Sequence, residues 1–552
     1  MRRIKRVALP ALIALALPGC YDLNVTNPNA LDHTDLWADA DLVESRTADA
    51  FKTWYQVNYA YGGAGFVLSF TAFQHSSPWA CRGPTSFNAL PRMPVDIEGI
   101  YCSDVSYPWY KLYAGYAETL DGLQALEVES VREALGPGRV TRMRAFSRFT
   151  QGLMLGSLAL LYDQAAIPHL EDYPYGEEPS LVGHDSVMAT ALRYLEEAAT
   201  LSAGADWPDI PAGWMSVAVT PDQLARLAHS FAARYRAAVA RTPTERSAVD
   251  WERVMADVDA GITTSWIMNM DPYQGFYDEV VDYTTFPGLA MESYFILGLA
   301  DQSGSYQRWL AMPVDAREPA PDADGDGEPD PILIVTPDTR FPQGASIADQ
   351  QANPGSIFVI PCADGPDAPA ACAEYDFSIQ IMWVRPERGR WRWSYYWHSD
   401  TWSYTSWTDF HWPEIKLAEM RLLKAEGLLR RGDAGGAAAL INVSRTANGL
   451  AATDAAGTNA DCVPRMPDGT CGDLMEMLKW EKRLETHFAG LFGAPWYFDG
   501  RGWGDLYRGT FVEMPVPCGE LTLLDMLPCY TFGGVGGDGA SPGSVYGWPG
   551  ES

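Results

Sequence analysis

The sequence predicts a mostly α-helical protein: a TPR-like solenoid of helical hairpins with a large insertion of loops and short strands. Apolar residues recur at helical spacing in successive segments on both sides of the insertion. Small residues lie where neighbouring helices would cross, and the helical period disappears between 262 and 411. Stacked hairpins bury apolar faces that one hairpin leaves exposed, although no strict repeat of fixed length is visible.

The first half of the chain has the pattern of one helix after another. Thr220 followed by Pro221 is a typical helix start, because the threonine caps the helix and proline suits its first position. Gly152 and Gly156 allow close contact between helices. We expect helices over Asp35–Tyr61, around Leu112–Leu123, over Thr141–Tyr162, around Val187–Ala198 with Asp185 as its cap, from Pro221 to about Arg241, and from Asp250 onward.

The second half begins with the insertion, in which proline, glycine and aromatic residues become frequent. Short β-prone runs occur at Ile332–Thr336 and Ser356–Ile360. Helical patterns then return, and the C-terminal stretch has the composition of loops. The helices expected here are Pro413–Arg431, with Ile415 on its apolar stripe, Ala434–Thr446 and about Asp473 to Phe488.

Residues 1–19 have the pattern of an export signal. A basic start is followed by the apolar run Val7–Leu17, which is too short to span a bilayer. The run ends in Leu17-Pro18-Gly19-Cys20, which resembles a bacterial lipobox with Cys20 as the site of lipid attachment. Pro18 is unusual there, and the alternative is an ordinary secretory signal with a chance cysteine. Either way the chain leaves the cytoplasm.

The chain is strongly acidic. Its net charge is −31, and loss of the four cations of the export signal makes the mature protein about −35. Such a surface repels nucleic-acid phosphates and anionic lipid, so we expect neither partner beyond the N-terminal lipid. Neutral ligands such as glycans remain compatible with it, and acidity can also simply serve solubility.

Eight cysteines follow Cys20, an even number that indicates disulfides in an exported chain. Many pairings are possible, and we expect the local ones, since each couple lies in a Gly/Pro-rich loop. The spacings are not those of zinc sites. The expected couples are Cys81–Cys102, Cys362–Cys372, Cys462–Cys471 and Cys518–Cys529.

Two C-terminal stretches carry a family resemblance. The stretch Pro413–Leu450 contains Leu-Ala-Glu at 417–419, Ala-Glu at 425–426, and Asn442 and Arg445 ahead of Gly-Leu at 449–450. In this order it resembles a signature of the SusD/RagB family of outer-membrane nutrient-binding lipoproteins. Trp480–Gly504 resembles a second signature of that family. It departs from the pattern at Ala489 and by extra residues around Phe492–Pro495, as a divergent member would.

The resemblance implies a single domain over 20–552, helical at 34–262 and 411–493, with the insertion at about 263–410 and a loop region at 494–552. It implies a binding protein without catalytic activity, lipid-anchored at the outer membrane and facing the exterior. Such a protein passes oligosaccharides or other oligomeric nutrients to a TonB-dependent, SusC-like receptor.

Two segments are candidates for ligand contact. In an extended strand, Trp391, Trp393, Tyr395 and Trp397 share one face, on which sugar rings could stack. The alternative is that this face is buried against the helices. The second candidate is the loop 73–88 with Trp79, Arg82 and Asn88, where the resemblance places part of the ligand site; the alternative is an ordinary surface loop.

An acidic run is a candidate Ca²⁺ site. Asp322, Asp324, Asp326 and Asp330 have the spacing that opens a calcium-binding loop, but Leu333 stands where an EF-hand needs glutamate. A solvated acidic loop is the alternative.

Carboxylates near the C-terminus allow a different function. Glu481 and Glu485 lie four residues apart, and Asp499 follows, so an extracellular glycoside hydrolase is one rival interpretation. The alternative for these acids is a structural ion-pair network. A TPR-like scaffold that binds only a partner protein is the second rival.

Overall fold

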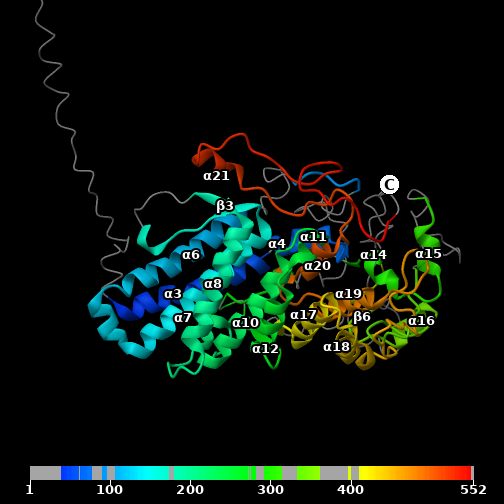
Figure 1. The fold of residues 1–552 in the computed structure, drawn as a ribbon, viewed down its shortest axis with the longest axis horizontal. Coiled ribbons are helices and arrows are strands. Elements are labelled where there is room, and N and C mark those ends of the chain that lie inside the picture. Colours follow the sequence, from blue (N-terminus) through cyan, green and yellow to red (C-terminus); the bar gives the residue numbers. More distant parts are fainter. Residues whose placement is uncertain are drawn as a thin grey trace, which may run out of the picture.

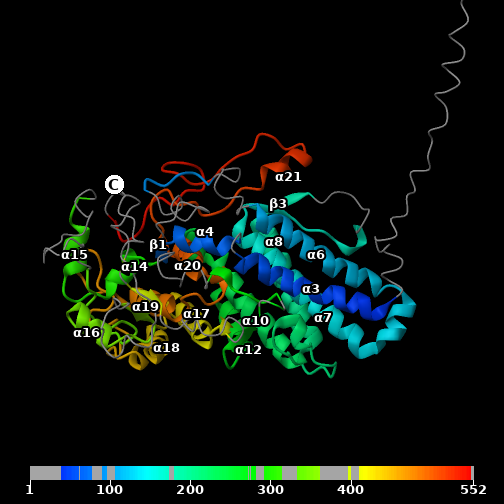
Figure 2. The same cartoon turned by 180° about the vertical axis from the view of Figure 1, so that it is seen from behind.

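A computed structural model describes residues 39–60, 63–76, 90–95, 106–172, 180–271, 273, 275–280, 291–313, 332–360, 394, 396–398 and 410–548. The described chain is mostly helical, which confirms the predicted fold class. Figures 1 and 2 show the arrangement of the elements from two opposite sides.

The long helices pack on one another in chain order. Each helix contacts the next in the series α3, α6, α7, α8, α10 and α12. The series continues after the insertion, where α12 contacts α17, α17 contacts α18, and α18 contacts α19. Figure 1 shows α3, α6, α7 and α8 at one end of the molecule and α18 and α19 toward the other. Their bounds are α3 (Ala40–Tyr59), α6 (Tyr107–Ala125), α7 (Glu129–Leu161), α8 (His184–Ser202), α10 (Pro221–Ala238), α12 (Trp251–Ala260), α17 (Leu417–Arg430), α18 (Ala434–Ala447) and α19 (Leu474–Glu485).

Local sequence explains several helix starts. Thr220 and Gln223 form a capping box at the start of α10, each side chain bonding to the backbone N–H of the other residue. Asp250 caps α12 by accepting a hydrogen bond from the N–H of Arg253. The predicted N-cap of α8, Asp185, was wrong by two residues, because Gly183 is the N-cap. Asp185 lies in the first turn, where its negative charge interacts favourably with the helix dipole.

Two glycines of α7 allow the close packing that the sequence predicts. A β-carbon on Gly156 would lie 2.1 Å from the Tyr235 ring of α10. One on Gly152 would lie 2.7 Å from Leu195 of α8. Only a residue without a side chain lets the three helices approach this closely.

Shorter elements connect and cover the long helices. The helices among them are α4 (Ala64–Thr71), α9 (Ala212–Met215), α11 (Pro243–Ala248), α14 (Tyr294–Leu297), α15 (Ser305–Leu310), α16 (Ile347–Ala352), α20 (Pro495–Trp503), α21 (Cys518–Leu523) and the 3₁₀ turns η2 (Leu170–Asp172), η3 (Gly298–Ala300) and η9 (Leu491–Gly493). The strands form antiparallel pairs: β1 (His75–Ser76) with β5 (Met291–Glu292), β2 (Gln164–Ala166) with β3 (Leu181–Gly183), β4 (Trp266–Met270) with β8 (Phe410–Ile415), and β6 (Phe358–Val359) with β7 (Trp397–His398).

The insertion differs from the sequence prediction in two ways. It contains the helices α14, α15 and α16, although no helical period was visible there. The run Ile332–Thr336 forms no strand, because side chains take up its backbone groups. The N–H of Ile334 donates to the Tyr396 hydroxyl (2.8 Å), and that of Val335 donates to Asp301 (3.2 Å).

The predicted helix Pro413–Arg431 begins late. Phe410–Ile415 is strand β8, which pairs with β4, and helix α17 starts at Leu417. Pro413 disfavours a helical conformation of the residue before it. Ile415 is buried as a strand residue rather than on a helical stripe.

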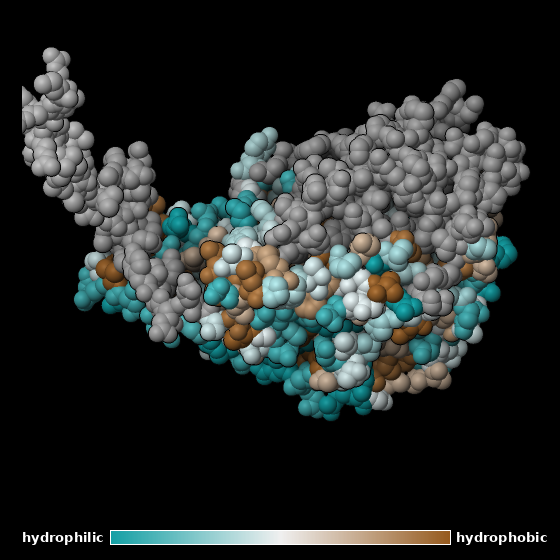
Figure 3. Space-filling view, turned by 90° about the horizontal axis from the view of Figure 1, so that it is seen from above, coloured by the Kyte–Doolittle hydropathy of each residue, from teal (hydrophilic) through white to brown (hydrophobic). Residues whose placement is uncertain are grey.

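Two predicted disulfides are confirmed, Cys462–Cys471 and Cys518–Cys529. The cysteines of the other two predicted couples, and Cys20, lie outside the described residues. Within the described ranges, no helix is both long and apolar enough to cross a membrane. Figure 3 shows a described surface that is largely hydrophilic with scattered hydrophobic residues.

Candidate ligand site and the buried cluster beside it

Two segments that the sequence singles out are both hydrogen-bonded to strand β5. His75 of β1 pairs with Glu292 of β5 in a two-stranded sheet. Outside this sheet, the N–H of Glu292 donates to the carbonyl of Tyr396 (3.2 Å), and the N–H of Ser394 donates to the carbonyl of Glu292 (3.0 Å). Residues 75, 292, 394 and 396 therefore lie close together, although long stretches of chain separate the three segments in the sequence.

This arrangement joins the two candidate ligand segments at their bases. The chain enters the rest of the loop 73–88 after Ser76, and it leaves the aromatic run 390–397 through Ser394 and β7. The proposed contact residues Trp79, Arg82, Asn88, Trp391, Trp393 and Tyr395, and the side chain of Trp397, lie outside the described residues.

The even-numbered face of the aromatic strand is the buried one. Ser394, Tyr396 and His398 are all buried, and the Tyr396 hydroxyl donates to the Gln350 side chain (2.7 Å). The sequence placed Tyr396 and His398 on the face opposite to the tryptophans. These buried positions are thus not those of the predicted ligand platform.

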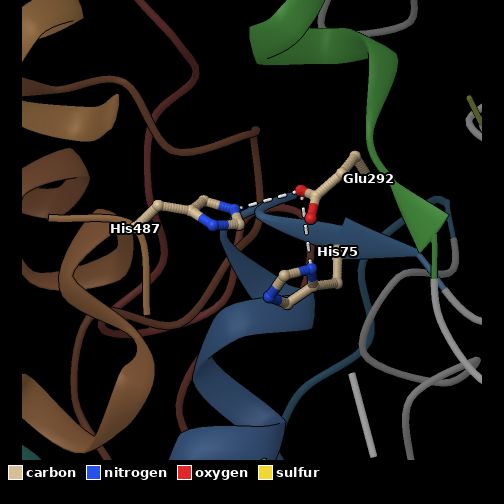
Figure 4. Close-up of side chains that lie close together, drawn as sticks. All are labelled: His75, Glu292 and His487. Carbon is tan, nitrogen blue, oxygen red and sulfur yellow. Dashed lines mark hydrogen bonds and ion pairs between the residues drawn. The ribbon is translucent and has the colours of Figure 1, made fainter. Parts of the chain in front are cut away.

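A buried cluster of ionisable side chains adjoins this sheet. Figure 4 shows His75, Glu292 and His487 converging from β1, β5 and the chain that follows α19. The Glu292 carboxylate oxygen Oε2 lies 3.1 Å from Nε2 of His487 and 3.6 Å from Nδ1 of His75. All three side chains are at most 2% exposed.

Aromatic neighbours fix the rings of the cluster. The Phe488 ring stacks on His75, with centroids 4.6 Å apart and an interplanar angle of 15°. His398 stacks on His487 in the same way, at 4.7 Å and 11°. Because a neighbouring ring packs against the face of each imidazole, the plane of the imidazole is fixed. Its nitrogens therefore keep their direction.

Burial controls the charge of these groups. It lowers the pKa of His75 to about 3, against the opposing pull of the nearby Glu292, and it raises the pKa of Glu292 to about 8. Burial also lowers the pKa of His398 and of His487 well below the usual range. The imidazoles are therefore neutral at pH 7, and a neutral imidazole nitrogen can act as an acceptor or a metal ligand.

The sequence analysis did not identify this cluster. Its members come from three distant segments, and no local spacing connects them. The only local signal was that His75 lies in a candidate ligand loop and His487 at the end of the helix with the signature acids.

The acids of the hydrolase interpretation belong to the core. Glu481 is fully buried and lies 2.8 Å from Arg340. Asp499 pairs with Lys482 (2.7 Å) and Arg246 (3.1 Å). The Ser444 hydroxyl lies within hydrogen-bond distance of both Glu485 and Glu481 (2.7 Å to Glu481), and its one proton is donated to either of them. These carboxylates have the structural role that the sequence analysis gave as the alternative, so they do not flank a sugar-binding cleft.

Other residues of the family signatures are structural as well. Glu419 forms a two-pronged ion pair with Arg234 of α10, at 2.7 and 2.8 Å. Glu426 does the same with Arg246, at 2.6 and 3.0 Å. These signature residues thus attach α17 to α10 and α11, α20 to α11, and α19 to α20. The calcium candidates at Asp322, Asp324, Asp326 and Asp330 lie outside the described residues.

Comparison with known proteins gives similarity in structure only. No family model and no curated protein matches the sequence. A SusD superfamily protein from Bacteroides vulgatus is 14% identical with a TM-score of 0.49, covering 85% of this chain and 89% of its own. A SusD homolog from Parabacteroides distasonis is 15% identical with a TM-score of 0.48, covering 83% and 84%. The structure is similar to those of SusD-like proteins.

A third similar structure was solved with a xylogluco-oligosaccharide. It is 13% identical, has a TM-score of 0.43, and covers 84% of this chain and 82% of its own.

Proposed function

We propose that this chain is a cell-surface binding lipoprotein that captures oligosaccharides, or other oligomeric nutrients, and delivers them to a TonB-dependent outer-membrane transporter. The observation that carries the proposal is that β5 is hydrogen-bonded both to β1, in the loop 73–88, and to Ser394 and Tyr396, in the aromatic run 390–397. A site built from both segments would combine stacking surfaces from Trp391 and Trp393 with polar groups from Arg82 and Asn88.

The charge of the protein supports a neutral ligand. A chain with a net charge of −31 repels acidic polymers, whereas neutral sugars meet no electrostatic barrier. The lipid on Cys20 would hold the protein at the outer membrane, facing the exterior, next to a SusC-like receptor. The proposed role is ligand binding without catalysis. The structural role of Glu481 and Asp499 supports this role.

Binding to a panel of neutral oligosaccharides tests the proposal. We expect calorimetry to detect binding of at least one oligosaccharide, and the double variant W391A/W393A to weaken it at least tenfold, since each lost stacking contact costs about 1–2 kcal/mol. Y273A is the matched control, because Tyr273 is an aromatic residue with 87% of its surface exposed. It should leave the affinity unchanged.

Two results would contradict the proposal. One is a protein that binds no member of a broad glycan and peptide panel and brings down no β-barrel receptor from detergent-solubilised membranes. The other is release of reducing sugar from a bound polysaccharide, which would favour a hydrolase.

A further inference from the structure

We infer that His75, Glu292 and His487 form a binding site for one divalent transition-metal ion, with Zn²⁺ as the best match. Two imidazoles and one carboxylate are a common Zn²⁺ ligand set, whereas Ca²⁺ prefers oxygen ligands alone. Within the described residues, this is the group of histidines and carboxylates close enough to share an ion. The inference does not depend on the proposed function, and it is separate from the acidic run 322–330.

The distances between the donor atoms fit a small ion. The three donor atoms all lie within 4.8 Å of one another, and two of the separations are 3.1 and 3.6 Å. Zn²⁺ bonds of about 2.0–2.1 Å in tetrahedral geometry place neighbouring donor atoms about 3.3 Å apart. The site therefore needs movements of only a few tenths of an ångström along these two edges.

The donor side chains are held in place before any ion binds. Phe488 and His398 stack on the rings of His75 and His487, and Glu292 lies in β5, where its backbone bonds to Ser394 and Tyr396 fix it beside β1. Binding of an ion to a buried site of this kind costs little side-chain entropy, and this raises the affinity for the ion. It also keeps water and competing ligands away from the ion.

The other nitrogen of His75 has a polar neighbour. Its Nε2 lies 3.2 Å from the side-chain amide of Gln74, and that amide also reaches the carbonyl of Gly493 (3.0 Å). Because this amide nitrogen donates to Gly493, it also donates to Nε2 of His75, which accepts. In the protein without an ion the proton of His75 is therefore on Nδ1, and binding of an ion at Nδ1 would displace it.

An ion in this position would join three distant parts of the chain. His75 lies in β1, Glu292 lies in β5 and bonds to Ser394 and Tyr396, and His487 follows α19. The ion is thus a cross-link between the sheet and the C-terminal helices. Because its ligands are buried, it would be taken up as the chain folds.

Metal titration of the full mature chain, purified without a histidine tag and stripped with a chelator, tests the inference. With Zn²⁺ alone as the probe, we expect one tightly bound ion per chain and a rise in the thermal midpoint. E292Q and H487Q should each weaken this binding at least tenfold. E292Q is informative because an amide can still hydrogen-bond to both imidazoles, so a merely hydrogen-bonded cluster would tolerate it.

H229N is the matched control. His229 is a partly exposed imidazole that bonds to Asp257 (3.0 Å), far from the cluster in the sequence, and its loss should not change the stoichiometry. X-ray absorption of the Zn²⁺-loaded wild-type protein gives a second readout that needs no variant. Two nitrogen ligands of imidazole type support the site.

Three outcomes overturn the inference. The first is that the stripped protein binds no Zn²⁺ at about 100 µM metal, a concentration roughly a hundredfold above even a micromolar dissociation constant. The second is an absorption spectrum without imidazole ligands. The third is unchanged binding in folded E292Q and H487Q.

Discussion

Buried arginine–carboxylate pairs are the main residue-scale feature of the core. Arg234, Arg246 and Arg340 are almost fully buried, and each meets at least two carboxylates. Guanidinium groups suit this role because their planar fork matches a carboxylate with two parallel hydrogen bonds. Removing one partner leaves an uncompensated charge in the core, which is far more costly than losing a surface pair.

The pair between Glu426 and Arg246 makes stability depend on pH. Burial alone would raise the pKa of Glu426, but the charge and hydrogen bonds of Arg246 outweigh it and lower the pKa to about 2. Since the folded pKa lies below the unfolded value, the carboxylate stabilises the fold above about pH 4.5. That contribution is lost as the pH falls toward 2.

We expect E426Q to lower the free energy of unfolding at pH 7 by about 3 kcal/mol. The deficit relative to wild type should shrink between pH 4.5 and 2, because the wild-type protein then loses the same charge. Urea denaturation at several pH values measures it. E133Q, at an exposed position of α7, is the control and should change stability by less than about 0.5 kcal/mol at every pH. A deficit independent of pH would contradict the prediction.

At the scale of elements, the long helices follow from local sequence, whereas the short helices of the insertion and the shortest strands do not. The capping box at Thr220, the Asp250 cap and the 3.6-residue period predict α10 and α12 to within a few residues. The strands β1, β5 and β7 are two residues long and exist only through pairing with distant segments. A pattern of such length carries no periodicity, so the sequence could not show it.

The contact between α7 and α10 allows a sharp test. We expect G156A to lower the free energy of unfolding by about 1–3 kcal/mol, because the added methyl group would overlap the buried Tyr235 ring. Urea denaturation measures the change. In G213A the added methyl group meets nothing within 4 Å, so this control should leave stability unchanged or raise it slightly. Equal stability of G156A and wild type would show that the helices can move apart.

For the whole molecule, the sequence predicts a membrane connection through the N-terminus. The acidic protein would not bind an anionic membrane surface by charge. A lipid on Cys20 would be the attachment, and the segment after it would link the lipid to the helical body.

We expect C20S to move the protein from the detergent phase to the aqueous phase in phase-partition experiments on expressing cells. The mature wild-type N-terminus should carry a lipid mass by mass spectrometry. N24S, four residues further on, is the control and should remain in the detergent phase. An unlipidated wild-type Cys20 would contradict the anchor but leave the ligand-binding proposal standing.

The sequence by itself determined the helical class, the order of the long helices and two of the disulfides, because periodicity, caps and cysteine spacing are local properties. It also singled out the loop 73–88 and the run 390–397. Only the tertiary structure decided that both segments are hydrogen-bonded to β5, that Glu481 and Asp499 are in core ion pairs, and that His75, Glu292 and His487 converge. Each of these depends on contacts between residues far apart in the chain, and the packing of the whole protein, not any local pattern, brings such residues together.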